Sequence, residues 1–201
     1  MVFIPDKQSL YPDGYRTYVD VEHLTDHLCG ARRSGHFRGV TTVVCKLFNL
    51  VQPDKAFFGR KDYQQLVVLT KMVEDLNMDI EVIGCPIVRE PDGIAMSSRN
   101  RYLSEEERAQ GLLLSRTLKI VSEAMQDAHV SLYEVKKIAL EYLEINSNKS
   151  FDLEYLEWVN AKDLERIEHL EGFKGIITVA MAARVGKTRL IDNTQVEVHR
   201  D

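Results

Sequence analysis

Apolar positions in the first 86 residues follow two alternating periods, and each period predicts a different kind of element. Short apolar runs predict strands, whereas apolar residues three and four apart predict amphipathic helices. A run at residues 2–4 is strand-like, and a turn sequence at residues 11–14 follows it. From there the predicted order is strand, helix, strand, helix and strand, at residues 16–21, 40–51, 55–58, 66–76 and 80–83. Strands that alternate with helices favour a parallel sheet with right-handed crossovers, and therefore an α/β fold.

The pattern changes after residue 99. Ser104 with Glu107, and again Ser131 with Glu134, have the spacing of a capping box in front of a long helical pattern. Strand-like stretches follow at residues 151–155, 176–183 and 188–191. Helices followed by strands predict a small α+β domain. We therefore expect two domains, residues 1–87 and residues 88–201.

Composition limits the class of protein. The chain has 201 residues, of which 44% are hydrophobic and 28% charged, as in ordinary globular proteins. A net charge of -5 gives no general attraction for nucleic acid. The three cysteines are far apart in the sequence, which argues against a disulfide framework or a zinc site. With no apolar run of membrane-spanning length and no signal-like N-terminus, we expect a cytoplasmic protein without a membrane or nucleic-acid partner and without metal ligands of its own.

A first candidate site follows the predicted strand at residues 55–58. Gly59, Lys61 and Asp62 stand between this strand and the next helix. Glycine lets the backbone approach a phosphate closely, a helix N-terminus presents free amides, and lysine adds a compact positive charge. The alternative is structural, because Asp62 and Gln65 have capping-box spacing and would then only close the helix end. Gln64 and Gln65 also carry amides suited to a hydroxyl or carboxylate of a small substrate.

A second candidate site is the most informative stretch of the sequence. A turn at residues 91–93 leads into Met96, Ser97, Ser98 and Arg99, just before the predicted second domain. The arginine offers paired donors to phosphate oxygens, and the serine hydroxyls add neutral donors. A loop between domains could close over a nucleotide and stabilise charge as it develops. The alternative is a polar linker without a binding role.

Three further features give weaker signals. His36, at the start of a predicted helix, could contact a phosphate or a substrate, or it could be a partly buried hydrogen-bonding residue. Asn193 is interpreted as a turn residue. Residues 183–189 resemble the end of a P-loop, but they lack its first glycine and the helix that would follow, so a Walker site is not expected.

Taken together, these segments resemble the pantothenate synthetase family. The resemblance runs from about residue 2 to Asn193 and rests on the order and spacing of residues 35–44, 58–65, 96–100 and 189–193. It implies a Rossmann-like nucleotidyltransferase domain, related to class I aminoacyl-tRNA synthetases, followed by a small α+β domain. It also implies a C–N bond-forming ligase that uses ATP to join pantoate to β-alanine through a pantoyl adenylate, with release of AMP and pyrophosphate.

The resemblance implies roles for single residues as well. An ATP site is expected at Gly59, Arg60, Lys61, Asp62, Val88, Met96, Ser97, Ser98 and Arg99. Lys61 and Arg99 are the expected catalytic residues, whereas Gln65 and His36 are expected to bind substrate. Arg60 stands where many members carry glutamate, so its side chain is expected to tolerate change. The family further implies Mg²⁺ bound with ATP, and a homodimer.

One departure from the family concerns its N-terminal segment. Members begin with a segment that carries a His-x-Gly-His motif and a pantoate-binding glutamine, and this sequence contains no such motif. The expectation is an incomplete Rossmann-like sheet with an exposed edge. Two alternatives therefore stay open: a related nucleotidyltransferase with another substrate, and a non-catalytic fragment that binds nucleotide weakly or associates with itself.

Overall fold

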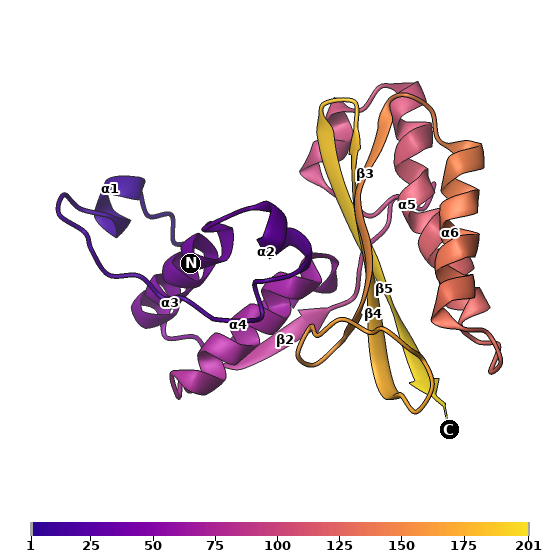
Figure 1. Cartoon of the computed structure of the whole chain (residues 1–201). Helices are drawn as coiled ribbons and strands as arrows, with labels where there is room; N and C mark the ends of the chain where they lie inside the picture. Colours follow the sequence, from indigo (N-terminus) through magenta and orange to yellow (C-terminus); the bar gives the residue numbers. More distant parts are fainter. Residues whose placement is uncertain (1, 201) are drawn as a thin grey trace. The chain divides into compact units, whose positions relative to one another are not determined.

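The computed structural model describes residues 2–200, and these form two compact units. The first unit contains the residues up to Phe58 together with Gln64–Cys85. The second contains Gly59–Tyr63 and the residues from Pro86 onward. Each unit has its own hydrophobic core, and Figure 1 shows the elements of each. The short segment Gly59–Tyr63 thus belongs to the second unit, although the sequence on both sides of it belongs to the first.

The first part of the chain is α/β. Its elements are α1 (Lys7–Leu10), α2 (Leu28–Arg32), α3 (His36–Val51), β1 (Lys55–Gly59), η1 (Arg60–Asp62), α4 (Tyr63–Asp75) and β2 (Glu81–Cys85). Strands β1 and β2 pair in a parallel two-stranded sheet. The fully buried Val68 and Leu69 of α4 pack in one core with Phe37 and Phe48 of α3. The predicted α/β class and these two strands are confirmed, while the sequence pattern did not reveal α1 and α2.

Two segments predicted as extended do not join a sheet. Residues 2–4 and residues 16–21 form no strand. In the second of them, the hydroxyl of Thr41 donates to the carbonyl of Val19 (2.6 Å), and the amide of Val19 donates to the hydroxyl of Thr42 (3.0 Å). Side chains of α3 therefore bond the backbone that a neighbouring strand would otherwise bond. The strand prediction was wrong because an apolar run does not reveal which partner will satisfy its backbone.

The second unit is a three-stranded antiparallel sheet with two long helices on one face (Figure 1). Its elements after Pro86 are η2 (Ser98–Tyr102), α5 (Glu105–Ala124), α6 (Leu132–Asn146), β3 (Phe151–Asn160), β4 (Lys174–Val185) and β5 (Thr188–His199). The strand order is β3-β4-β5. The turn at Gly186 joins β4 to β5, so the segment that resembled a P-loop is a hairpin. None of the helices formed by residues 2–200 is long and apolar enough to cross a membrane.

Both predicted capping boxes are present. The hydroxyl of Ser104 accepts from the amide of Glu107 (3.2 Å), and the carboxylate of Glu107 accepts from the amide of Ser104 (2.9 Å). Ser131 and Glu134 repeat the arrangement at the start of α6. These bonds satisfy amides that have no partner inside the helix, and so they fix where α5 and α6 begin.

Ser104→Ala is expected to lower the free energy of unfolding by about 1 kcal/mol, because it removes the capping acceptor. Ser115→Ala is the matched control, since Ser115 lies in the middle of the same helix and its hydroxyl, among residues 2–200, donates to the carbonyl of Leu112 within that helix. The control should change stability little, because alanine is a better helix former than serine. Urea unfolding of both variants measures the difference, and equal losses would contradict a capping role for Ser104.

Candidate active site

The two segments predicted to handle phosphate meet within the second unit. The ammonium group of Lys61 donates to the carbonyl oxygen of Met96 at 3.3 Å. The charge of Arg99 is close enough to affect the pKa of Lys61. The segment from Gly59 to Asp62 and the segment from Met96 to Arg99 therefore face a common space, although more than thirty positions separate Lys61 from Met96 in the sequence.

The first segment leaves its backbone open at Gly59. This glycine has extended backbone angles (φ -70°, ψ 132°), and a Cβ placed on it would meet nothing within 4 Å. Neither backbone conformation nor packing within the protein requires a glycine here, so the open space is available to a ligand. Asp62 is exposed and makes no side-chain hydrogen bond to any residue between 2 and 200, which leaves the proposed capping role without support. Tyr63 anchors the end of the segment by donating to the carbonyl of Ala161 (2.8 Å).

Lys61 is a partly buried cation with a lowered pKa. Burial lowers its pKa from the ordinary value, and the charge of Arg99 lowers the pKa further, while Asp62 and Asp192 oppose the shift. A partly desolvated ammonium group is less screened by water than a surface lysine. Its attraction for a phosphate oxygen is correspondingly stronger.

A tight hairpin-like turn sets the start of the second segment. The amide of Met96 donates to the carbonyl of Val88 (2.9 Å), and Arg89 forms a bridge with Ala95. Gly93 takes the left-handed conformation that the turn requires (φ +100°), so the predicted turn is confirmed. Arg108 of α5 holds this turn with two ion pairs of 2.6 Å, to Glu90 and Asp92. The pKa of Asp92 is lowered by the hydrogen bond from Arg108, and that of Glu90 by hydrogen bonds from Asn100 and Arg108.

The four residues of the second segment divide into anchored and available groups. The hydroxyl of Ser97 accepts from the amide of Arg99 (3.3 Å) and caps η2. Asn100, next in the chain, is buried and donates to Glu90 and to the carbonyl of Ala95. The side chains of Ser98 and Arg99 are exposed and form no hydrogen bond or ion pair with another described residue. Ser98 and Arg99 are therefore the donors of this loop that a ligand can engage.

Gln65 and His36, predicted to bind substrate, belong to the first unit. Gln65 is half-buried, and its amide has no partner among the residues that the structure describes. Its neighbour Gln64 is buried and holds the loop before α2, donating to the carbonyls of Leu24 and His27 at 2.9 Å. The ring of His36 lies 3.0 Å from the guanidinium of Arg33. The roles of Gln65 and His36 in substrate binding stay predictions.

The structure also shows a residue whose importance the sequence did not reveal. Asn193 was interpreted as a turn residue, but it lies within β5 and is buried. Its amide nitrogen donates to the carbonyls of Arg60 and Lys61, both at 2.9 Å. The carbonyl of Arg60 is held by this bond, whereas its side chain is exposed. No local pattern could have found this contact, since the partners are 133 and 132 positions apart.

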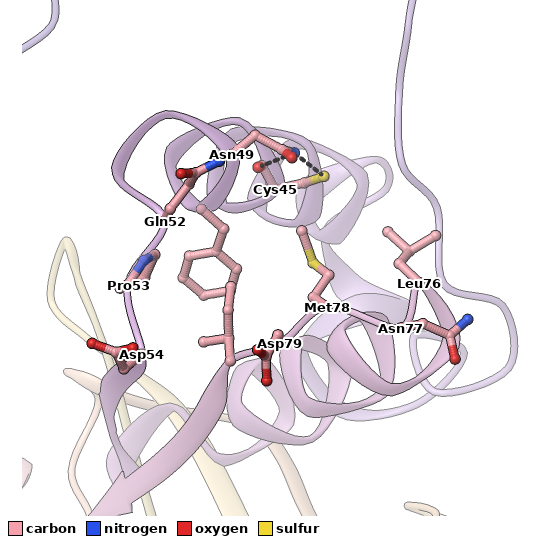
Figure 2. A pocket seen from close by; sticks show the side chains of 11 residues that line it. Cys45, Asn49, Gln52, Pro53, Asp54, Leu76, Asn77, Met78 and Asp79 are labelled. Carbon is pink, nitrogen blue, oxygen red and sulfur yellow. Dashed lines mark hydrogen bonds between the residues drawn. The ribbon is translucent and has the colours of Figure 1, made fainter.

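A cavity of about 580 Å³ lies elsewhere, in the first unit (Figure 2). It is lined by the end of α3, the link at residues 52–54 and the link at residues 76–80. These links lead into the first residues of β1 and β2, whereas ligands of parallel sheets bind beyond the carboxyl ends of the strands. None of the predicted site residues lines this cavity.

Comparisons with known proteins agree with the architecture. The family model described as Pantoate-beta-alanine ligase matches residues 1–195. A pantothenate synthetase of Acetivibrio thermocellus is 50% identical over 198 residues, which are 98% of this chain and 69% of that protein. The crystal structure of pantothenate synthetase from Thermus thermophilus is 42% identical with a TM-score of 0.87, and the match covers 94% of this chain and 67% of that one.

A third relative was solved with ligands. The pantoate-β-alanine ligase of Francisella tularensis, complexed with β-γ ATP and β-alanine, is 27% identical with a TM-score of 0.65. That match covers 94% of this chain and 61% of the Francisella chain. Sequence and structure together place the chain among the ligases. It belongs to the pantoate–β-alanine ligase family, and it spans about two thirds of the length of the curated relatives that it matches.

Proposed function

We propose that the chain carries out the ATP-dependent condensation of pantoate with β-alanine through a pantoyl adenylate. The observation that carries the proposal is the bond between Lys61 and the Met96 carbonyl, which puts two segments with phosphate-binding chemistry side by side. The family membership supports the same reaction, and so do the β-γ ATP and β-alanine of the Francisella complex. AMP and pyrophosphate are the other products.

The triphosphate would lie between the two segments. The open backbone at Gly59 permits a close approach, and the partly desolvated ammonium group of Lys61 supplies a positive charge. Arg99 and Ser98 have side-chain donors that no described residue occupies, and they would grip the phosphates from the other side. The exposed Val88 and Met96 would flank the nucleotide.

In the first step, the pantoate carboxylate attacks the α-phosphorus of ATP and the bond to pyrophosphate breaks. No general base is needed, because the carboxylate is already ionised near neutral pH. The barrier lies in bringing anions together and in stabilising charge on the phosphoryl oxygens, which Lys61 and Arg99 would do. Gln65, whose amide is unpartnered among the described residues, would hold pantoate, and His36 is a second candidate for this role.

In the second step, the uncharged amine of β-alanine attacks the acyl carbon of the adenylate. The new C–N bond forms, AMP leaves with the electron pair of the broken C–O bond, and the amine loses a proton. Side-by-side binding of the adenylate and the amine would supply much of the rate.

Magnesium would arrive as part of the nucleotide substrate. Among residues 2–200, no three side chains of His, Cys, Asp or Glu come together in a way that could hold a metal ion. Mg²⁺ commonly binds to the phosphates of ATP with few protein ligands, which fits this donor set. The exposed carboxylate of Asp62, beside Lys61, is the acidic group of the first segment that would be near the Mg²⁺ ion.

We further propose that the protein is a cytoplasmic homodimer.

The test of the reaction is a stoichiometric product assay with pantoate, β-alanine and MgATP. The proposal predicts pantothenate, AMP and pyrophosphate in equal amounts. Release of ADP and phosphate instead would exclude an adenylate.

Exchange of labelled pyrophosphate into ATP, driven by pantoate or by a panel of other carboxylic acids, separates this ligase from a nucleotidyltransferase with another substrate. Exchange with another acid but not with pantoate would contradict the proposed substrate, and no reaction with any acid would favour a non-catalytic chain.

Arg99→Ala is expected to slow pantoate-dependent pyrophosphate exchange by about a hundredfold, because a charged donor to the developing phosphoryl charge is lost. Arg99→Lys should recover part of the rate, since it restores the charge without the paired donors. Arg101→Ala is the control, because this arginine of η2 is exposed and, among the described residues, its guanidinium interacts with Tyr102 and not with the site. Exchange rates measured at saturating substrates test the prediction, and a normal rate in Arg99→Ala would remove this role.

A further inference from the structure

Asn193 holds two consecutive backbone carbonyls of the first phosphate segment. Its amide nitrogen donates to two consecutive carbonyls, those of Arg60 and Lys61, at 2.9 Å each. The residue is only 4% exposed and lies in regular antiparallel register with Ala180 of β4. A short side chain on a paired strand has little freedom, so the position of these two carbonyls is tied to the sheet.

Asp192, the residue before it, holds the turn that leads into the second segment. Its carboxylate accepts two hydrogen bonds from the guanidinium of Arg89, at 2.6 Å and 3.1 Å. Arg89 in turn donates to the carbonyl of Gly93 (3.1 Å) and bridges to Ala95, the residue before Met96. The Asp192 carboxylate also accepts from the backbone amide of Asn193 (2.8 Å), so the two residues form one connected network.

We propose that Asp192 and Asn193 are positioning residues that hold the two phosphate-binding segments in register from one strand. Asn193 fixes the carbonyls around Lys61, and Asp192 fixes the turn before Met96 through Arg89. The inference rests on the proposed function, since it gives β5 a role in the same ATP site. It adds two residues that act through Lys61 and the loop, without contacting the nucleotide themselves.

The physical reason is the sensitivity of charge stabilisation to distance. Lys61 reaches the Met96 carbonyl at 3.3 Å, which is long for a hydrogen bond, so this contact alone would not fix its ammonium group. The carbonyls of Arg60 and Lys61 set the direction in which the Lys61 side chain leaves the backbone. A displacement of about 1 Å at a catalytic group can cost about a hundredfold in rate.

Limited proteolysis tests the positioning directly. Trypsin cuts after Arg60 and after Lys61, and the two bonds contain the very carbonyls that Asn193 holds. Asn193→Ala removes the donor, and Asn193→Asp keeps the shape but, when ionised, cannot donate. Both variants should be cut at these two sites about tenfold faster than the wild type. Gln195→Ala is the matched control on the same strand, since Gln195 donates to Thr178 and not to this segment.

MgATP titration of the same variants tests the functional consequence. Asn193→Ala and Asn193→Asp should bind MgATP about tenfold more weakly, because they lose the hydrogen bonds that hold the backbone at Lys61. Gln195→Ala should bind MgATP normally. A merely structural role would lower the fraction of folded protein without changing the affinity of the folded fraction, which thermal unfolding of each variant reports.

The outcomes separate this inference from the proposed function. If Lys61→Ala does not weaken MgATP binding, the ATP site itself is wrong. If Lys61→Ala weakens binding while both Asn193 variants keep wild-type affinity and wild-type tryptic cleavage, the site stands and the positioning role is overturned.

Discussion

Lys61→Ala is expected to slow pantoate-dependent pyrophosphate exchange by a factor of about a hundred to a thousand. The substitution removes a partly desolvated ammonium group that faces the space between the two phosphate segments. It also removes the bond to the Met96 carbonyl, so the second segment loses a contact with the first.

Arg60→Ala is the matched control for this variant. Arg60 is the preceding residue and carries the same charge, but its side chain is exposed and only its carbonyl is held. Nearly normal exchange is expected in Arg60→Ala. Equal losses in the two variants would show that net charge in this region matters and that the position of Lys61 does not.

Arg89→Ala is expected to give a large loss of stability, about 3 kcal/mol in the free energy of unfolding, because it leaves a buried carboxylate without its charged partner. The side chain of Asp192 is 2% exposed, whereas that of Arg89 is 35% exposed. Asp192→Asn should cost less, about 1 kcal/mol, since the arginine that remains reaches water. Removing the arginine is therefore expected to cost more stability than neutralising the aspartate.

Urea unfolding of the two variants measures this asymmetry. Arg166→Ala provides a comparison. Arg166 is half-exposed, and the carboxylate of its partner Glu157 is less buried than that of Asp192. A loss in Asp192→Asn that equals or exceeds the loss in Arg89→Ala would contradict the assignment of Asp192 as the buried, dependent partner.

Local rules predicted the parts of this fold whose causes are local. The capping boxes at Ser104 and Ser131 were found from the sequence because both partners lie within four residues. The turn at Gly93 was found for the same reason. The segment at residues 16–21 was misjudged, because the hydroxyls that bond its backbone come from Thr41 and Thr42.

The candidate site divides in the same way. Residue types and spacing indicated Lys61 and Arg99, and the contact between Lys61 and Met96 followed only from the structure. Residue type alone did not separate the neighbouring Gln64 and Gln65, and only the family resemblance selected Gln65 as a substrate ligand. In the structure the amide of Gln64 closes a loop, whereas that of Gln65 has no partner among the described residues. Asn193 was missed because a strand residue shows nothing of a partner more than 130 positions away.

A double-mutant cycle on MgATP affinity with Lys61→Ala and Arg99→Ala tests whether the two segments are two sides of one triphosphate site. In a single site, the contribution of each side depends on the other. Arg99→Ala is therefore expected to weaken binding much less when Lys61 is already alanine than when it is present, because contacts in one site are coupled. Losses that add independently in the double variant would contradict a single shared site.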